Sequence, residues 1–338
     1  MAETEGDIAK VVEVVRGAPK VELHVHLAGA MPQATLDGLC SKYGVAPRSA
    51  AFVDYATFIE TWVWMVDELI READDYRRIA EDALTAMATQ SNVVYAEVFC
   101  SPGTPVKEGK FSLADALDAI LAGAAAARAA TGIEAVFVVD LERLTGPEWG
   151  MALLDSMAPY VGKGVIGVGL GGPEAACEAE VYAPVFARAR EMGLRLTAHC
   201  GESQGAPEVA ACLDALGIER IGHGVRIMED PELVVRAAGL GVPFEVCLTS
   251  NVATGLVASI QAHPLPAMLA AGLVCTLNSD DPLFFDTTLA DEYAAAVTRL
   301  GMDYDAAVGL LRAAIATSWA PDAYKAELEA QLDAYLER

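Results

Sequence analysis

The sequence predicts an α/β fold, a (β/α)8 TIM barrel with additional helices that cap the active-site end. Eight short apolar runs alternate with longer amphipathic segments, which is typical of parallel strands joined by helices. A length of 338 residues suits such a barrel as one unit. Hydrophobic residues make up 54% of the chain, enough for a large core. We therefore expect 1–338 to form a single domain.

The expected strands and helices follow one another in strict alternation. Short apolar runs predict strands at 21–27, 93–99, 135–141, 165–170, 195–199, 220–222, 242–246 and 273–277. Helical periodicity between these runs predicts helices at 113–130, 147–157, 175–192, 208–216 and 231–240. This order of elements is the reason for expecting a closed parallel barrel.

The interval between the first two strands is much longer than one helix. We expect it to form a helical cap insertion at about 33–91, which includes helices at 55–71 and 76–89. Two further helices, 304–317 and 322–336, are expected after the last strand.

The charge of the chain is strongly acidic, with 48 Asp and Glu residues against 23 Lys and Arg residues. This composition disfavours binding to nucleic acid and to anionic membranes, because both need a basic surface. The first residues lack the basic and apolar regions of a signal peptide, and no run reaches the roughly 18 apolar residues of a membrane span. Seven scattered cysteines, none in a CxxC pair, are expected to be reduced. We therefore expect a cytoplasmic protein.

Four of the five histidines end predicted strands, and an acidic pair follows the eighth strand. The histidines are His24, His26, His199 and His223, and the acidic pair is Asp280 and Asp281. His24 and His26 lie two residues apart on one strand, so their side chains point to the same face. Active sites of such barrels gather at the carboxyl ends of the strands. We therefore expect these side chains to meet at one rim.

Imidazoles and a carboxylate at one rim predict a metal site. This mixture of donors favours zinc or another borderline divalent ion with an open position for water. Binuclear hydrolases on this scaffold carry a bridging Lys or Glu at the end of the fourth strand, whereas this chain has the glycine-rich run 166–172 there. A single metal ion is therefore expected.

Taken together, these motifs resemble the adenosine deaminase family of the amidohydrolase superfamily. The order and spacing agree over most of the chain, at KVELHVHLAG (20–29), NVVYAEVFCSP (92–102), GVGLGGPE (167–174), TAHCGE (197–202), RIGHGV (220–225) and HPLPAMLAAGLVCTLNSDDP (263–282). The resemblance implies hydrolytic deamination at C6 of a 6-aminopurine nucleoside, adenosine or adenosine-like, with ammonia and the 6-oxopurine as products. Its implied partner is a small purine molecule, and no organic cofactor is needed.

The resemblance also implies a role for each site residue. One zinc ion (Zn2+) per chain would be held by His24, His26, His199 and Asp280. His223 would help to remove the proton of the water on the zinc. Glu202, protonated in a dry pocket, would donate to purine N1. Asp281 would accept a hydrogen bond from N7 or the leaving amine, and the Gly172 backbone N–H would face N3.

The sugar end departs from the family pattern. Ala28 and His26 mark the expected contacts there, but Ala28 stands where family members commonly carry an acidic residue for the ribose 5′ end. Phe99 occupies a position that is often Arg in nucleoside deaminases. Trp62 and Trp64 in the cap would suit either helix packing or a wall for a bulky 5′ substituent. Adenine and a 5′-modified adenosine, aminodeoxyfutalosine-like or 5′-thio-substituted, therefore stay open as substrates.

Two functions of other classes are also open. An ester or amide hydrolase shares the barrel, but the absent bridging ligand and the Glu202–Asp281 pair disfavour it. A non-catalytic purine-binding relative would be expected to lose metal ligands, and none is missing from the sequence. His263 has no direct chemical role in this interpretation, and Ser250 and Asn278 are suggested to orient neighbouring site residues. The sequence carries no signal of an oligomeric state.

Overall fold

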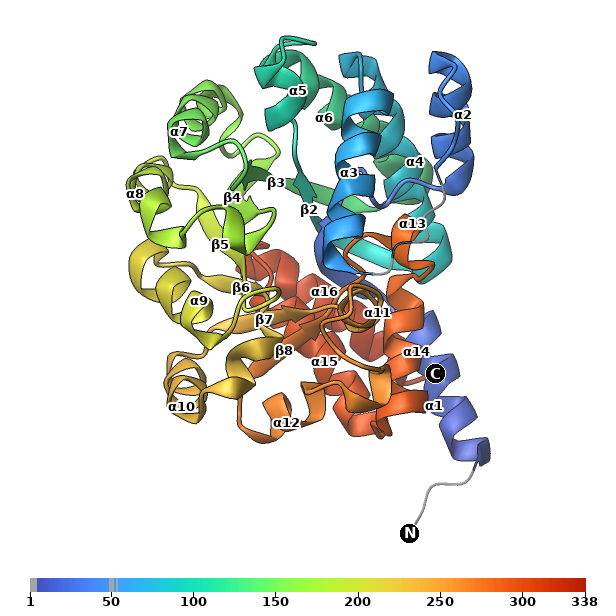
Figure 1. The fold of residues 1–338 in the computed structure, drawn as a ribbon. Coiled ribbons are helices and arrows are strands. Elements are labelled where there is room, and N and C mark those ends of the chain that lie inside the picture. Colours follow the sequence, from blue (N-terminus) through green and yellow to red (C-terminus); the bar gives the residue numbers. More distant parts are fainter. Residues whose placement is uncertain (1–4, 49–51, 53) are drawn as a thin grey trace.

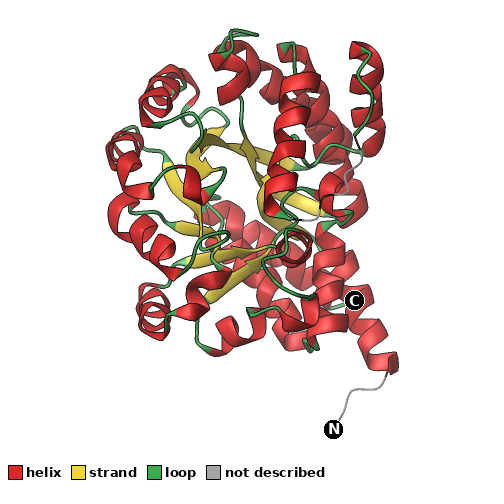
Figure 2. Ribbon diagram, in the orientation of Figure 1, coloured by secondary structure: helices red, strands yellow, loops and turns green. Residues whose placement is uncertain are grey.

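Eight parallel strands form a barrel in the order β1 to β8, surrounded by helices (Figures 1 and 2). The computed structural model describes residues 5–48, 52 and 54–338. The strands are β1 (Lys20–His26), β2 (Val93–Cys100), β3 (Glu134–Glu142), β4 (Val165–Gly171), β5 (Arg195–Cys200), β6 (Arg220–His223), β7 (Pro243–Val246) and β8 (Val274–Leu277). The predicted barrel is therefore confirmed.

The barrel closes between its first and last strands through Asp280. Asp280 forms an isolated parallel bridge with Val25 of β1. Its backbone N–H donates to the His24 carbonyl at 3.0 Å, and its carbonyl accepts from the His26 N–H at 2.8 Å. The backbone that ends the barrel thus also places Asp280 beside two predicted metal ligands.

Helices alternate with the strands as expected, with extra helices at several positions. They are α1 (Glu5–Gly17), α2 (Gln33–Tyr43), α3 (Tyr55–Leu69), α4 (Ala73–Ser91), α5 (Gly103–Lys107), α6 (Leu113–Thr131), α7 (Pro147–Ser156), α8 (Ala183–Glu191), α9 (Ala206–Ala211), α10 (Pro231–Leu240), α11 (Leu248–Ala253), α12 (Leu265–Ala270), α13 (Pro282–Phe285), α14 (Leu289–Leu300), α15 (Tyr304–Thr317) and α16 (Asp322–Leu336). In the described part of the chain, no helix combines the length and apolarity needed to cross a membrane.

The helix predicted at 175–192 is wrong in its first half. The chain there forms two short 3-10 turns, and α8 begins only at Ala183. Pro184 lies in the first turn of α8 and cannot continue a helix from upstream, because it lacks the N–H and restricts the preceding residue. The extended Cys177 also directs its carbonyl to the Arg143 guanidinium, 2.6 Å away.

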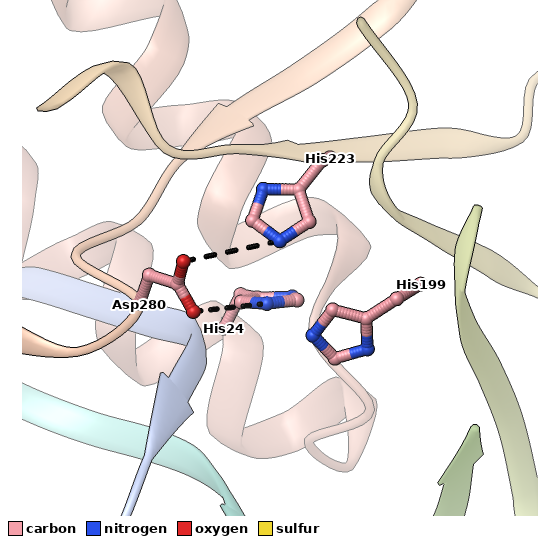
Figure 3. Close-up of side chains that lie close together, drawn as sticks. All are labelled: His24, His199, His223 and Asp280. Carbon is pink, nitrogen blue, oxygen red and sulfur yellow. Dashed lines mark ion pairs between the residues drawn. The ribbon is translucent and has the colours of Figure 1, made fainter. Parts of the chain in front are cut away.

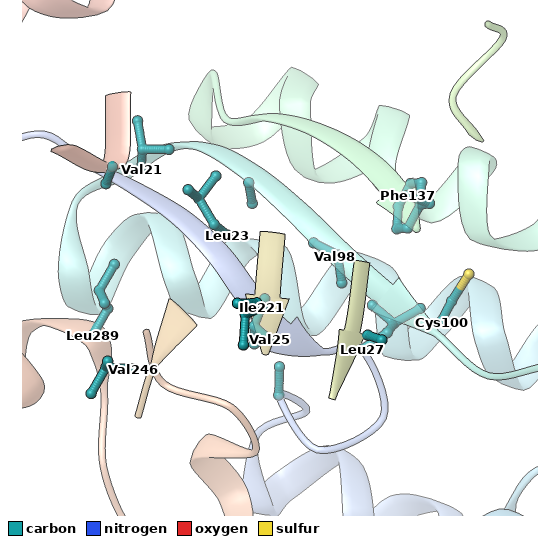
Figure 4. Close-up of a cluster of buried hydrophobic side chains, with 14 of the residues drawn as sticks. Val21, Leu23, Val25, Leu27, Val98, Cys100, Phe137, Ile221, Val246 and Leu289 are labelled. Carbon is teal, nitrogen blue, oxygen red and sulfur yellow. The ribbon is translucent and has the colours of Figure 1, made fainter. Parts of the chain in front are cut away.

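Strand β1 shows how the sequence separates core from site. Figure 4 shows Val21, Leu23 and Val25 in one cluster of buried apolar side chains, all 2% exposed or less. Since side chains alternate along a strand, the intervening residues His24 and His26 face the opposite side. The same seven-residue strand thus supplies both hydrophobic packing and two imidazoles.

Helices α2, α3 and α4 occupy the interval between β1 and β2, where the helical cap was expected. Asp54 caps the start of α3, accepting a hydrogen bond from the Thr57 N–H at 2.9 Å. From this start, α3 directs Tyr55, Phe58 and Trp62 toward the cavity at the barrel end. Figure 1 shows α3 beside the opening of the barrel.

Candidate active site

Four buried side chains converge at the carboxyl ends of the strands. One ligand atom from each of His24, His199, His223 and Asp280 lies within 4.8 Å of the others (Figure 3). His24 Nε2 is 3.6 Å from Asp280 Oδ1, and His223 Nε2 is 3.9 Å from Asp280 Oδ2. The strand ends of β1, β5 and β6 therefore meet the residue that follows β8, as the sequence predicted.

His26 reaches the same point from the other side. Its Nε2 lies 3.1 Å from His199 Nε2 and 3.4 Å from Asp280 Oδ1. It also forms a second group of possible ligands with Asp280 and Asp281. All four predicted ligands are thus neighbours, and His223 lies close enough to compete with His26 as the fourth.

The chemistry of these residues fits a divalent cation. His24 Nε2 is buried and has no hydrogen-bond partner among the described residues. Burial alone would lower the pKa of His24, but Asp280 and Glu245 outweigh it and raise that pKa to about 10. Burial lowers the pKa of His26 to about 4, which leaves a neutral imidazole. A site that attracts positive charge and offers neutral imidazoles is suited to zinc.

An ion-pair network below the site orients His24. Glu245 Oε2 lies 2.8 Å from His24 Nδ1, and its other oxygen lies 2.7 Å from Arg220 Nε. Arg220 also pairs with Glu97 and lies under the Trp319 ring, 3.5 Å from its centroid. A carboxylate on the far nitrogen of a ligating histidine fixes the ring and raises its basicity. The sequence prediction missed this network, although single charged residues inside apolar strands were a visible signal.

Glu202 is buried beside the cation site, and the loop that carries it is clamped by Glu174. Glu174 accepts hydrogen bonds from the Glu202 N–H at 3.2 Å and the Ser203 hydroxyl at 3.0 Å. Burial, followed by the negative charges of Asp280 and Glu174, raises the pKa of Glu202 well above its usual range. Tyr55 of the cap also contributes a hydrogen bond to this carboxyl. These surroundings therefore favour the protonated form of the Glu202 carboxyl.

The predicted residue Asp281 is also buried and lies at the cavity wall. Burial and the charge of Asp280 raise its pKa well above the usual range, so its carboxyl can hold a proton. Ser250 donates to Asp280 Oδ2 at 2.6 Å, a contact that fits its suggested orienting role. Asn278 instead contacts Thr276 and the Leu23 backbone.

Left-handed backbone conformations occur at three site residues. His223 has φ 56° and Asp280 has φ 63°, values that side-chain-bearing residues adopt only at an energetic cost. Gly172, at φ 85°, adopts such a conformation without that cost and lines the cavity. The barrel thus holds His223 and Asp280 in strained backbone conformations that direct their side chains toward the site.

A cavity opens above these groups at the carboxyl ends of the strands. Its walls include the predicted residues His26, His199, His223, Glu202, Asp280, Asp281 and Gly172. They also include side chains that the site prediction did not contain, namely Tyr55, Phe58, Ile59, Ser101, Asp140 and Glu142. Trp62 belongs to this wall, whereas Ala28 lines a smaller apolar pocket that shares His26, Trp62 and Ser101 with it.

Known proteins with similar sequences include an adenine deaminase and an aminodeoxyfutalosine deaminase. The sequence model of the adenosine deaminase family matches residues 19–335. The chain is 39% identical over 320 residues to an adenine deaminase of Rhizobium leguminosarum bv. trifolii, covering 93% of this chain and 98% of that protein. It is 34% identical over 335 residues to an aminodeoxyfutalosine deaminase of Streptomyces avermitilis, covering 95% of this chain and 92% of that protein.

Solved structures agree with these matches. A zinc-bound amidohydrolase of Burkholderia ambifaria superposes with a TM-score of 0.88 and 27% identity, covering 100% of this chain and 97% of that chain. The matched range extends from β1 into the last helix and spans the segments on which the resemblance was based. The chain therefore belongs to the adenosine deaminase family and is a hydrolytic purine deaminase, acting on carbon–nitrogen bonds of cyclic amidines.

Proposed function

We propose that this protein catalyses the zinc-dependent hydrolytic deamination of a 6-aminopurine at C6, releasing ammonia and the 6-oxopurine. The observation that carries the proposal is the convergence of imidazoles and Asp280 beside the buried Glu202 in one cavity. The zinc-bound structure from Burkholderia ambifaria supports the choice of metal.

We assign the chemistry as follows. The ion would be held by His24, His26, His199 and Asp280, and bound zinc would lower the pKa of a coordinated water to about 7. Glu202 donates its proton to N1 as C6 becomes tetrahedral. Asp281 accepts a hydrogen bond from a protonated N7 or from the leaving amine. The Gly172 backbone N–H faces N3, where the absence of a side chain lets the ring approach.

The cavity walls favour a neutral substrate over an anionic one. Among the lining residues, several are carboxylates, including Asp140 and Glu142, and none is Lys or Arg. A phosphate would normally be bound by a cationic side chain or by a set of backbone amides. A nucleoside, adenosine or adenosine-like, remains the substrate that the sequence favoured.

A second candidate substrate, the free base adenine, is favoured by Asp140 at the end of β3. In the proposed orientation, N1 faces Glu202 after β5 and N3 faces Gly172 after β4. N1, N3 and N9 follow one another along one edge of the purine. Strands β5, β4 and β3 follow one another around the barrel in the same order, so we expect N9 beside Asp140 of β3. Only the free base carries a hydrogen on N9.

The surroundings of Asp140 suit such a donor. The carboxyl is buried, and its Oδ1 has no hydrogen-bond partner within the described residues. Its Oδ2 accepts one long hydrogen bond, 3.4 Å, from Ser101, and lies 3.5 Å from His26 Nδ1. Because a carboxyl keeps acceptor capacity in either protonation state, it can accept a hydrogen bond from N9–H.

A panel of aminopurines tests the proposed function. Adenosine, 2′-deoxyadenosine, adenine and 5′-modified adenosines would be scored for ammonia release by the zinc-loaded protein, with zinc content measured in parallel. We expect release from at least one of them. No release from any aminopurine, with zinc bound, would reject the proposal.

The choice between base and nucleoside is tested with adenine and 9-methyladenine. If Asp140 binds N9–H, Asp140→Ala lowers kcat/KM for adenine roughly 2- to 10-fold, the effect expected for a hydrogen bond to an uncharged carboxyl. The value for 9-methyladenine should not fall. Asp155→Ala, which changes an exposed aspartate of α7 (57% exposed) in the same way, is the matched control. An equal loss on both substrates would count against adenine as the substrate.

A further inference from the structure

Asn251 connects His223 in the cavity to His263, the one histidine without an assigned chemistry. His263 Nε2 lies 3.1 Å from Asn251 Oδ1, and Asn251 Nδ2 lies 3.2 Å from His223 Nδ1. All three side chains are buried, between 0 and 4% exposed. These three side chains form a row of hydrogen-bonded groups. Because each hydrogen bond needs one donor and one acceptor, the row can determine which ring nitrogens carry protons.

The backbone N–H of Leu265 sets the direction of this row. It donates to His263 Nδ1 at 3.1 Å, and a backbone N–H can only donate. His263 Nδ1 therefore carries no proton, so the ring is neutral and its single proton lies on Nε2. Burial also lowers the pKa of His263 to about 4, in agreement with a neutral ring. Nε2–H donates to Asn251, which must turn its side-chain oxygen toward His263.

The same reasoning continues to His223. With its oxygen toward His263, Asn251 turns its NH2 group to His223 and donates to Nδ1. His223 Nδ1 is then an acceptor, and the proton of the neutral ring lies on Nε2. The Nε2 atom lies 3.8 Å from Glu202 Oε1 and 3.9 Å from Asp280 Oδ2. Figure 3 shows His223 directed at the Asp280 carboxylate. Acceptor oxygens on this side favour an N–H over a lone pair.

We propose that His263 is a positioning residue that, through Asn251, holds His223 in the tautomer with its proton on Nε2. His223 then offers the cavity a hydrogen-bond donor and no lone pair. This excludes His223 as a metal ligand and leaves His26 as the fourth, although the side chains alone bring both within reach.

The proposal also changes the catalytic role of His223. The family resemblance implied a base, which needs a bare Nε2. A protonated Nε2 instead donates to the oxygen that attacks C6 and stabilises the negative charge that this oxygen acquires when the water, whose pKa zinc would lower, loses its proton to solvent before the attack. Only this last point rests on the proposed function.

The opposite tautomer would disrupt the row at its far end. A proton on His223 Nδ1 requires Asn251 to turn its oxygen to His223 and its NH2 to His263. His263 would then carry its proton on Nδ1, facing the Leu265 N–H. Two buried donors would point at each other, and the hydrogen bond between them would be lost. The fold around α12 thus selects the tautomer of a residue in the cavity.

Nitrogen-15 NMR of the zinc-loaded wild-type protein, labelled at its five histidines, measures the tautomers directly. We expect a protonated Nε2 and a bare Nδ1 in both His223 and His263. A protonated Nδ1 or a metal-bound Nε2 in His223 would overturn the proposal. The measurement needs no turnover, so a wild type that releases no ammonia would reject the proposed function and leave the tautomer result standing.

Asn251→Asp tests the consequence for activity. A carboxylate accepts from both rings, so it should move the His223 proton to Nδ1 and lower kcat about 100-fold, the usual effect of losing one donor to developing charge. Asn92→Asp, at the end of α4, makes the same chemical change outside the site and should keep the wild-type kcat. A moved proton with unchanged kcat would contradict the donor role.

Replacement of His263 separates positioning from packing. His263→Gln retains an N–H that can serve Asn251, whereas His263→Leu retains bulk without a donor. We expect the Gln variant to keep most of the kcat and the Nε2 proton of His223, and the Leu variant to lose both. Equal kcat in the two variants would contradict the proposal that His263 acts on His223 through Asn251. If a variant fails to fold, the wild-type spectrum still decides the tautomer.

Discussion

Glu202 is a site residue whose pKa is changed by its surroundings. Burial and two neighbouring carboxylates raise its pKa well above the usual range, which favours the protonated form that a general acid needs. Glu202→Gln keeps the shape and an N–H but transfers no proton. We expect kcat to fall by 10²- to 10⁴-fold, roughly the contribution of general acid catalysis, with zinc content unchanged. Steady-state ammonia release and metal analysis would check this.

The control for this prediction is Glu180→Gln, which changes an exposed glutamate in the same way. It should behave like the wild type. Full activity of the Glu202→Gln variant would show that N1 receives its proton from another group.

Glu245 contributes through His24. Its carboxylate lies 2.8 Å from His24 Nδ1 and is paired with the buried Arg220 on its other side. Glu245→Gln weakens this support, and the loss of such a partner lowers metal affinity by roughly 10- to 100-fold. Competition with a zinc chelator would measure the change, with Glu191→Gln, at 71% exposure, as the control. An unchanged zinc affinity would mean that His24 needs no support from Glu245.

The site residues differ in how visible they are in the sequence. Histidines are rare in this chain and end predicted strands, so His24 and His199 stand out. Glu97 and Glu245 are single charges in apolar runs, Arg220 follows Glu219 at the start of another, and no spacing in the sequence connects the three. Only the barrel brings their strands side by side and pairs them below the site. The tautomer of a histidine likewise depends on partners that are distant in the sequence.

At the scale of elements, strand β4 contributes mainly through glycines, which have no side chains. A Cβ on Gly169 would lie 2.5 Å from Asp140 Oδ1 and 2.8 Å from the Phe99 ring. A Cβ on Gly171 would lie 3.1 Å from the same carboxyl. The glycines of the GVGLGG run therefore make room for side chains of β2 and β3. The sequence prediction connected this run with the absence of a bridging ligand and with Gly172, but not with this packing.

Adding one methyl group to β4 tests this packing. Gly169→Ala should destabilise the protein by about 1–3 kcal/mol, because overpacking forces Phe99 or Asp140 to move. Gly239→Ala in α10 is the matched control, since a Cβ there meets nothing within 4 Å. It should stabilise the protein by about 0.5–1 kcal/mol through helix propensity. Chemical denaturation would measure both, and an unaltered Gly169→Ala variant would contradict the packing argument.

Element boundaries depended on chemistry that periodicity does not show. The alternation of apolar runs predicted all eight strands, because buried parallel strands are nearly continuous in hydrophobicity. The segment 175–192 keeps a helical pattern, yet Pro184 and the Arg143–Cys177 hydrogen bond interrupt it. That bond joins residues 34 positions apart, so only the folded chain shows it.

At the scale of the whole molecule, folding buries many carboxyl groups. Those buried to 4% exposure or less include Glu22, Glu97, Asp140, Glu174, Glu202, Glu245, Asp280, Asp281 and Glu292. The sequence shows the acidic excess but not which acids are inside. Burial raises the pKa of Glu22 and of Asp140 to about 8. Such groups bind protons more tightly in the folded state, so they make stability fall as pH rises.

Glu292 of α14 makes this dependence measurable at a carboxyl that does not line the cavity. It accepts hydrogen bonds from the Thr249 N–H at 3.2 Å and the Thr287 hydroxyl at 2.9 Å, and burial raises its pKa from 4.5 to about 7. Its contribution to stability is therefore full below pH 4.5 and is lost as pH rises through 7. A shift of this size corresponds to roughly 3 kcal/mol.

Glu292→Gln imitates the protonated carboxyl at every pH. The free energy of unfolding of the variant, relative to wild type, should therefore rise by roughly 3 kcal/mol between pH 4.5 and a pH above 7. Urea denaturation at a series of pH values would measure this difference. A difference that stays constant across the window would mean that folding does not change the proton affinity of Glu292.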